Sequence, residues 1–220
     1  MTPIATKEEL AFIEQLFTPL VSDTMDRLGI AGCVLQHDIQ SIPFDPALKV
    51  AGIAFPCRVI PTTEYVEIHT LLEMVDAVPE DSVVLVAADS DTGAALWGGL
   101  MSTRAKARGA RGAIVNGGIR DFEQIAGIGF PVFGTNRCVK DIRRRGYMAE
   151  YNIPVTIGGV LVNPGDVVFG DANGVVVIHQ EDFPMLIEEL RKTAVGEMVT
   201  AAGLKEGRSA TELFKEFQTF

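Results

Sequence analysis

The longest strongly apolar stretch of this 220-residue chain is only about six residues long, from Val83 to Ala88. Its length and its β-branched residues are typical of a strand that is buried on both faces. A membrane-spanning helix needs about 20 apolar residues, so the sequence predicts no such helix. Buried strands of this kind are typical of layered α/β domains, in which helices cover the faces of a sheet.

Helices and strands can be placed along the chain from the spacing of its apolar residues. We expect helices over residues 7–17, 21–28, 64–75, 94–108, 181–202 and 210–217. We expect strands over residues 50–60, 81–89, 112–115, 131–133, 155–157, 160–162, 167–169 and 174–178. Pro56 lacks an N–H group and should confine its strand to a sheet edge or a bulge. Helices alternate with strands early and strands cluster late, which favours a layered α/β fold with a mixed sheet and with N- and C-terminal helices.

The charge balance argues against a nucleic-acid partner. The chain has 29 Asp and Glu residues against 19 Lys and Arg residues, a formal net charge of −10, whereas nucleic-acid-binding domains carry a basic face. The first residues lack the basic and apolar regions of a signal peptide. Three widely spaced cysteines, Cys33, Cys57 and Cys138, favour buried thiols in a reducing compartment over disulfides or a zinc site. We therefore expect a cytoplasmic protein that binds neither nucleic acid nor a membrane.

Several common functional motifs are missing from the sequence. It has no phosphate-binding P-loop, no Gly-x-Ser-x-Gly nucleophile motif and no His-Glu-x-x-His pair. The glycines of residues 127–131 begin like a dinucleotide-binding loop, but Pro131 and the lack of a third glycine interrupt the pattern. Because His37, His69 and His179 lie far apart in the sequence, we expect them to be structural residues rather than metal ligands.

The segment from Ala95 to Asp121 combines features that suit one kind of ligand. Gly98 and Gly99 precede a helix and leave its first N–H groups open to an anion. Arg120 offers a planar fork that pairs with a carboxylate through two hydrogen bonds. Asp121 is an oxygen ligand suited to Mg²⁺ or Mn²⁺. An anion cradle, an arginine and a metal-binding carboxylate together predict a site for a 2-oxo acid such as pyruvate, whose 2-oxo group the metal would polarise.

The same residues have a simpler interpretation. An adjacent Arg-Asp pair beside two glycines also occurs as an exposed ion pair in a loop, worth at most about 1 kcal/mol. The segment between the glycines and this pair carries a basic set that, on an acidic chain, is expected to face solvent: Arg104, Lys106, Arg108 and Arg111. Composition and spacing leave both interpretations open.

This segment also resembles the hallmark of a known family. Residues 96–101 and 115–121 are similar to the RraA-like family, which contains the regulator of ribonuclease activity A and the class II 4-hydroxy-4-methyl-2-oxoglutarate and 4-carboxy-4-hydroxy-2-oxoadipate aldolases. Residues 21–29 and 163–177 resemble further segments of the family, in the same order along the chain. Together the similar segments extend from about residue 20 to residue 180.

The resemblance implies a swivelling β/β/α fold. It implies one RraA-like domain over residues 1–220, with a core over about 20–180 and a C-terminal helical extension over about 181–220. It also implies a homotrimer or a hexamer of paired trimers, with active sites where subunits meet. The reaction that it implies uses a divalent metal, Mg²⁺ ahead of Mn²⁺, and forms no Schiff base.

The resemblance also implies roles for individual residues. Arg120 matches the arginine that binds the pyruvyl carboxylate, and Asp121 matches the aspartate that binds the metal. Arg120 and Asp121 are therefore the expected catalytic residues, and Asp121 is the expected metal ligand. The substrate cradle matches the backbone of four residues: Gly98, Gly99, Leu100 and Met101.

The chain departs from the family signature at Gly99. The aldolases have an aspartate there, which helps to hold a metal-bound water, the proton donor to the enolate. A water network or another acid, such as Asp89, Asp91 or Glu67, must replace it; otherwise the reaction is lost or changed. Asn116, where many relatives have aspartate, is a second and milder departure.

These observations lead to three hypotheses about function. The first is a metal-dependent lyase that cleaves 4-hydroxy-4-methyl-2-oxoglutarate-type substrates to pyruvate and a second carbonyl acid, or that decarboxylates oxaloacetate through the same enolate. The second is a non-catalytic regulator that binds a ribonuclease through its surface, which Gly99 favours. The third is a related pyruvyl-binding enzyme in which Gly99 makes room for a bulkier substrate. The intact Arg120–Asp121 pair favours an enzyme.

Overall fold

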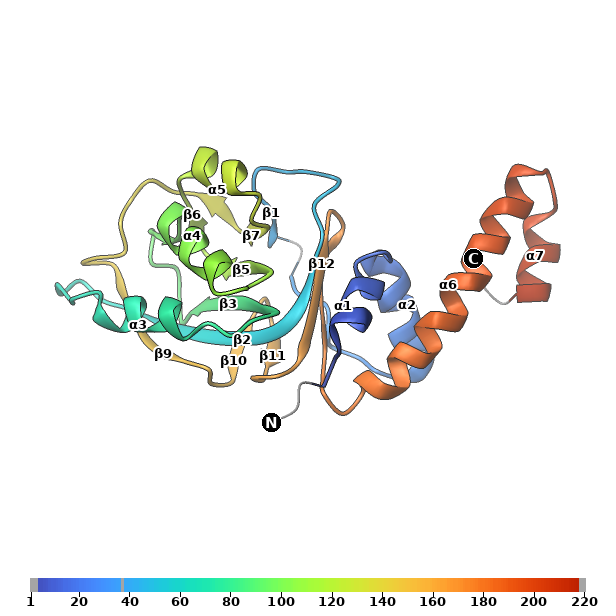
Figure 1. The fold of residues 1–220 in the computed structure, drawn as a ribbon, viewed down its shortest axis with the longest axis horizontal. Helices are drawn as coiled ribbons and strands as arrows, with labels where there is room; N and C mark the ends of the chain where they lie inside the picture. Colours follow the sequence, from blue (N-terminus) through green and yellow to red (C-terminus); the bar gives the residue numbers. More distant parts are fainter. Residues whose placement is uncertain (1–3, 37, 218–220) are drawn as a thin grey trace.

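The computed structural model describes residues 4–36 and 38–217, so His37 lies outside the described residues. A large mixed sheet forms the centre of the described chain, and helices lie on both sides of it (Figure 1). On one side lie α3 (His69–Ala77), α4 (Gly99–Ala107) and α5 (Phe122–Ile128). The terminal helices lie beyond strand β12: α1 (Lys7–Ile13), α2 (Thr18–Leu28), α6 (Phe183–Lys205) and α7 (Ala210–Phe217). The protein thus has a mixed α/β fold with helices at both ends.

In the described residues the large sheet has eight strands, in the order β1-β7-β5-β3-β2-β12-β13, with β9 also paired to β2. Strands β2, β3, β5 and β7 are parallel, and the others pair antiparallel. The bounds are β1 (Gln40–Ser41), β2 (Val50–Pro61), β3 (Ser82–Ala88), β5 (Gly112–Asn116), β7 (Val132–Gly134), β9 (Gly146–Tyr151), β12 (Val167–Asp171) and β13 (Gly174–Ile178).

Two smaller sheets flank the large one. The first is an antiparallel hairpin of β10 (Val155–Ile157) and β11 (Val160–Val162). The second is parallel and consists of β4 (Ala95–Trp97), β6 (Gly118–Ile119) and β8 (Asn136–Arg137). The carboxyl ends of β4 and β6 lie at the same edge, because the strands are parallel, and this edge carries the residues that the sequence singles out.

Strand β3 is buried on both faces, as its sequence predicts. Val84 and Val86 belong to the hydrophobic cluster that includes residues of α3, α4 and α5. Val83 and Leu85, which alternate with them, belong to the cluster that includes the β10–β11 hairpin. A third cluster joins α1, α2 and α6 to β12 and β13. Successive side chains of β3 therefore point to opposite faces of the sheet and pack into separate layers.

The sequence predicts Pro56 at a sheet edge or a bulge; the edge is wrong, and the irregularity in the strand comes two residues later, after Arg58. Strand β2 pairs with β3 along one side, and its other side pairs with β12 up to Ile53 and with β9 from Cys57 onward. Pro56 lies between these two partners, where its missing N–H group interrupts neither ladder. Its carbonyl still accepts a hydrogen bond from the Asn152 N–H group at 2.7 Å. A register shift in the β2–β9 pairing follows Arg58.

Two helices begin later than the sequence suggests. The segment Ala95–Trp97 is buried and forms strand β4, not the first turn of a helix over 94–108, because it pairs in parallel with β6. Helix α4 starts only after Gly98, whose φ of −161° is extended. The helix expected over 64–75 begins at His69. Apolar spacing alone did not separate a short buried strand from a helical turn.

The structure gives His179 a structural contact and places residues 127–131 at a helix end. Nδ1 of His179 lies 3.0 Å from the carboxylate of Asp166, a contact that joins the residue before β12 to the residue after β13. His69 is an exposed residue at the start of α3. Residues 127–131, which begin like a dinucleotide-binding loop, include the end of α5, where Gly129 adopts the left-handed conformation of a helix C-cap.

The three cysteines are free thiols. Cys33 and Cys57 are buried, and Cys138 is half-buried. Burial raises the pKa of the Cys57 thiol, which keeps it protonated and unreactive. None of the described helices is long and apolar enough to cross a membrane.

Helix α6 packs against α2 and carries Glu197, a half-buried residue. Burial raises the pKa of the Glu197 carboxyl, and repulsion from Asp23 of α2 raises it further. A carboxyl pKa that is raised by folding means that the ionised side chain costs stability at neutral pH. That cost disappears as the pH falls through the folded-state pKa.

We therefore expect Glu197→Gln to raise the midpoint of thermal unfolding at pH 7. The gain should be about 0.5 kcal/mol, or about 1–2 °C, and should fade as the pH is lowered. Glu188→Gln, on the exposed side of the same helix, is the matched control. An unchanged or lowered midpoint, or an equal rise in the control, would contradict the role of this carboxyl.

Candidate functional site

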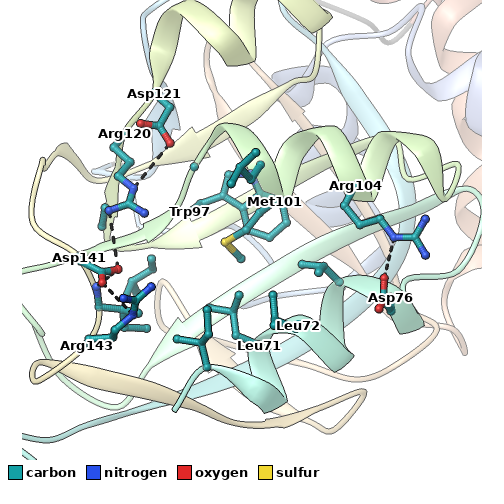
Figure 2. Close-up of a pocket in the computed structure, with 17 residues that line it drawn as sticks. Leu71, Leu72, Asp76, Trp97, Met101, Arg104, Arg120, Asp121, Asp141 and Arg143 are labelled. Atoms are coloured by element: carbon teal, nitrogen blue, oxygen red, sulfur yellow. Dashed lines mark hydrogen bonds and ion pairs between the residues drawn. The ribbon is translucent and has the colours of Figure 1, made fainter. Parts of the chain in front are cut away.

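A cavity of about 410 Å³ lies between α3, the first half of α4 and residues 141–143 (Figure 2). Its volume is within the range of sites that bind small molecules. Its lining includes Gly98, Leu100, Met101, Arg120 and Asp121, so the structure brings five of the six predicted site residues together at one cavity. The sixth, Gly99, is buried beside the cavity and does not line it.

Gly98 allows the turn after β4 to lie close to the turn after β6. It follows β4 and caps the N-terminus of α4. A Cβ atom at Gly98 would lie 2.7 Å from Oδ2 of Asp121 and 3.2 Å from Cγ of Arg120. Any larger residue would therefore displace the side chains of Arg120 and Asp121 from the start of α4.

Asp121 lies in the turn between β6 and α5. Strand β6 ends at Ile119, and Asp121 then adopts a left-handed conformation, with φ of 61°, before α5 begins. Its side chain does not cap α5; Oδ2 instead accepts a hydrogen bond from the Gly99 N–H group at 3.0 Å. A left-handed backbone is uncommon for residues other than glycine, although aspartate adopts it more readily than most. This conformation aims the carboxylate at the N-terminus of α4, where the helix dipole stabilises a negative charge.

This contact corrects one expectation from the sequence. The Gly99 N–H group does not remain open to a ligand anion, because Asp121 already accepts its hydrogen bond. The N–H groups of Leu100 and Met101 follow it in the first turn of α4, where a helix offers no internal acceptor. The anion cradle is therefore smaller than the sequence suggests, and it is next to a carboxylate.

Arg120 lies between two carboxylates (Figure 2). Its Nε is 3.6 Å from Oδ2 of Asp121, and one terminal nitrogen is 3.7 Å from Oδ1 of Asp141. Nε of Arg143 is 3.2 Å from Oδ2 of Asp141, which completes a row of alternating charges. The two Arg120 separations exceed ordinary hydrogen-bond lengths. Its N–H groups therefore retain the capacity to bind the carboxylate of a ligand.

Sequence reasoning missed Asp141, Arg143 and a second ion pair of the cavity. Nε of Arg104 lies 2.7 Å from Oδ1 of Asp76, which joins α4 to α3 at the end of the cavity away from Arg120 (Figure 2). Asp141 lies 20 residues beyond Asp121 in a loop, and no local pattern in the sequence links it to the site. Only the fold brings these charges to one cavity.

Three residues of the basic set, Arg104, Lys106 and Arg108, are exposed as expected, and Arg111 is half-buried; the set also contacts neighbouring elements. In addition to the Arg104–Asp76 pair, Nε of Arg108 donates to the carbonyl of Val78 at 3.2 Å. Arg111 forms an ion pair with Glu14 at 2.7 Å, and Lys106 donates to the carbonyl of Ile128. These side chains join α4 and the following loop to neighbouring elements.

The three acids suggested as substitutes for the missing aspartate do not line the cavity. Asp89 forms a two-point ion pair with Arg58, at 2.9 and 2.7 Å, and this hydrogen-bonded pair lowers the Asp89 pKa. Asp91 accepts a hydrogen bond from the Gly93 N–H group. Glu67 lies before the start of α3 and is exposed. The carboxylates that do line the cavity, besides Asp121, are Asp76 and Asp141.

Gln124 fills the space next to Gly99. A Cβ atom at Gly99 would lie 2.2 Å from Oε1 and 2.9 Å from Cβ of Gln124, which extends from α5. Gly99 therefore does not create extra room for a substrate, contrary to one hypothesis from the sequence. The position at which the family signature has an acid is closed by an amide side chain from another helix.

The residues at the cavity fit a hydrated divalent ion better than a fully protein-bound one. The described residues contain no group of three or more His, Cys, Asp or Glu side chains that could hold a metal. Mg²⁺ usually keeps several waters and needs only one or two carboxylates. Oδ2 of Asp121 is used by the Gly99 N–H group, while Oδ1 faces no protein donor in the described part of the chain. Asp121 thus fits as a single-carboxylate ligand for Mg²⁺.

The fold and the cavity together define a mixed α/β protein in which an arginine and a carboxylate follow one strand of a small parallel sheet and lie beside the helix N-terminus that follows its neighbour. A family model described as RraA-like, Aldolase/RraA, matches residues 18–177. The chain therefore belongs to the RraA-like family.

Two curated relatives differ in how much of their length this chain spans. Protein DlpA of Legionella pneumophila is 30% identical over 196 residues, which are 84% of this chain but 31% of DlpA, so the chain spans about a third of that protein. A protein of Halalkalibacterium halodurans named "Putative 4-hydroxy-4-methyl-2-oxoglutarate aldolase" is 26% identical over 214 residues, which are 96% of this chain and 97% of that protein.

Solved structures share the fold. A chain described under "novel cellulases from microbes associated with the gut ecosystem" has a TM-score of 0.83 and 32% identity, and the match covers 90% of this chain and 89% of that chain. Streptomyces coelicolor RraAS2, described as an unusual member of the RNase ES inhibitor RraA protein family, has a TM-score of 0.79 and 23% identity, with 90% and 97% covered. At 23% identity, the likeness to RraAS2 shows the fold alone.

We expect Gly98→Ala to weaken binding of a small carboxylate such as pyruvate by about tenfold or more in the presence of Mg²⁺. The new methyl group would displace the carboxylate of Asp121 and the side chain of Arg120. Titration calorimetry measures the effect. Gly127→Ala is the matched control, because a Cβ atom there meets nothing within 4 Å. Wild-type affinity in the folded Gly98→Ala protein would show that this close approach does not form the binding site.

Proposed function

We propose that this chain is a divalent-metal-dependent lyase that cleaves 4-hydroxy-2-oxo acids, of which 4-hydroxy-4-methyl-2-oxoglutarate is the type substrate, to pyruvate and a second carbonyl compound. The observation that carries the proposal is the arrangement of Arg120. Its guanidinium group lines the cavity, lies within 3.6 Å of Asp121 and has N–H groups available for a ligand carboxylate. Membership of the RraA-like family, which includes relatives named as aldolases, supports it.

Arg120 would bind the C1 carboxylate through two hydrogen bonds and so orient the substrate against Asp121. Asp121 would hold the metal through its free oxygen, while its hydrogen bond to Gly99 fixes the carboxylate in place. The chemistry expected of a divalent ion at this position is polarisation of the 2-oxo group and stabilisation of the charge that develops on it. The first-turn N–H groups of α4 would add partial positive charge on the same side.

The proposed reaction breaks the C3–C4 bond. The 4-hydroxyl group loses its proton, C4 becomes a carbonyl carbon, and the electron pair of the broken bond forms the pyruvate enolate. A proton added at C3 then gives pyruvate, so the atoms of the substrate are all recovered in the two products. With oxaloacetate the same bond breaks and CO₂ leaves in place of the second carbonyl compound.

The first test is pyruvate release from 4-hydroxy-4-methyl-2-oxoglutarate and from oxaloacetate, with Mg²⁺ and with EDTA. Turnover should require the metal. Arg120→Ala should lower kcat/KM by about 10²-fold or more, because the substrate loses its carboxylate partner. Arg191→Ala, which removes the same charge from α6 outside the cavity, should leave kcat/KM unchanged. Near-normal kcat/KM in a folded Arg120→Ala variant would rule out this assignment.

The missing acid can be restored in a second test. Gly99→Asp alone should give little gain, because its side chain would collide with Gln124. Gly99→Asp combined with Gln124→Gly removes the three atoms nearest to the new Cβ and should raise kcat by about tenfold or more, as expected for a positioned acid. Pyruvate release is the measurement, and Gln124→Gly alone is the control for the loss of the amide.

The outcome also separates the enzyme from the alternative function. If wild type, Gly99→Asp and the double variant are all folded and inactive, the chain is better interpreted as a non-catalytic regulator that binds a ribonuclease through its surface. The description of Streptomyces coelicolor RraAS2 as a member of an RNase ES inhibitor family makes that alternative worth testing. Activity in the double variant alone would show an intact scaffold whose natural reaction has changed.

Exposed apolar residues beside the cavity support the proposal that subunits meet there, in a homotrimer or hexamer. Leu100 is 83% exposed at the cavity rim. Val139 is 90% exposed and lines a second hollow of about 220 Å³, which shares Arg120 and Asp121 with the first. Apolar residues that gather on one exposed face, here around Arg120 and Asp121, are typical of surfaces that a partner covers.

A further inference from the structure

The Arg120 end of the cavity and the wall formed by α3 differ in chemistry (Figure 2). One end holds Arg120, Asp121, Asp141 and Arg143. The wall formed by α3 and the residue before it is apolar, with Ile68, Leu71, Leu72 and Val75, and Met101 of α4 lies opposite. A ligand whose carboxylate is bound by Arg120 would therefore place the rest of its structure among hydrocarbon side chains.

The charges of the described lining residues leave one cation available. Arg104 lies 2.7 Å from Asp76, and Arg143 lies 3.2 Å from Asp141, so each of these charges is neutralised at close range. Among the described lining residues, only Arg120 lies farther than 3.5 Å from its carboxylate neighbours. Within one subunit, the described lining therefore suits one ligand carboxylate and offers no second unneutralised cation along the apolar wall.

A second carboxylate would be poorly placed in this cavity. An ionised group that leaves water for an apolar surface without a cationic partner loses its hydration and gains nothing in return. An alkyl or aryl group at the same position removes apolar surface from water on both sides of the contact, which is favourable. The wall of α3 thus discriminates between substrates by the polarity of the group at C4.

We infer that the natural substrate is a 4-hydroxy-2-oxo monocarboxylic acid with an alkyl or aryl group at C4, in place of the second carboxylate of 4-hydroxy-4-methyl-2-oxoglutarate. This inference rests on the proposed lyase function. The bond accounting is unchanged: the 4-hydroxyl proton leaves, the C3–C4 bond breaks, and C3 takes up a proton to give pyruvate. The second product is an aliphatic or aromatic aldehyde or ketone, not a 2-oxo acid.

A matched pair of substrates tests the inference with the full-length protein and Mg²⁺. 4-Hydroxy-5-methyl-2-oxohexanoate has an isopropyl group at C4 where 4-hydroxy-2-oxoglutarate has a carboxylate of similar shape. We expect kcat/KM to be at least about tenfold higher for the isopropyl compound, as for one well-buried branched group. Turnover that is equal, or that favours the dicarboxylate, would overturn the inference while leaving the lyase function intact.

A variant tests whether the α3 wall is the cause. Leu72 is 48% exposed, so Leu72→Lys should be tolerated by the fold and should add a cation to the apolar wall. It should shift the kcat/KM ratio toward the dicarboxylate by about tenfold or more. Leu161→Lys is the control, because Leu161 is 53% exposed on β11 and lies outside the cavity. An equal shift in the control, or no shift in Leu72→Lys, would overturn the role of the wall.

A binding measurement separates this inference from the proposed function. Titration calorimetry compares 4-methyl-2-oxopentanoate with 2-oxoglutarate, neither of which can be cleaved by the proposed reaction. Tighter binding of the monocarboxylate by the wild type, lost in Arg120→Ala, supports the inference even if no turnover is found. Tighter binding of 2-oxoglutarate, or binding of neither acid, overturns it.

Discussion

The hydrogen bond from the Gly99 N–H group to the Asp121 carboxylate joins the two turns on which the whole site depends. It forms because β4 and β6 are parallel neighbours, so the turn after each strand lies at the same edge of the small sheet. Gly98 lets the turns approach within a distance that a Cβ atom would prevent. The left-handed backbone of Asp121 aims its carboxylate at the helix and leaves Arg120 facing the cavity.

The charges around Arg120 determine which ligand the cavity can accept. Asp121 and Asp141 lie close enough to hold the guanidinium in position but too far to use its N–H groups fully. The remaining cations of the described lining are neutralised by nearer partners, and helix α3 supplies a hydrocarbon wall. The proposed preference for a single carboxylate with an apolar extension rests on this balance of charge and surface.

Gln124 of α5 occupies the space beside Gly99 of α4. Position 99 has no side chain, and the amide of Gln124 lies where a side chain at 99 would begin. The acid of the family signature is therefore replaced by a packed surface and not by an open space. Restoring the acid requires a change at both positions, which the sequence signature alone does not indicate.

The sequence by itself determined the buried strand β3, the helix that follows the paired glycines, and the presence of Arg120 and Asp121 at one site, because these depend on local spacing and on motif. It also indicated the RraA-like family. Only the tertiary structure decided that Ala95–Trp97 is a strand, that Pro56 lies between two strand partners, that Asp141 lines the cavity and that Gln124 lies beside Gly99. The physical reason is that these features depend on strand pairing and helix packing between distant segments, which leave no periodic pattern in the chain.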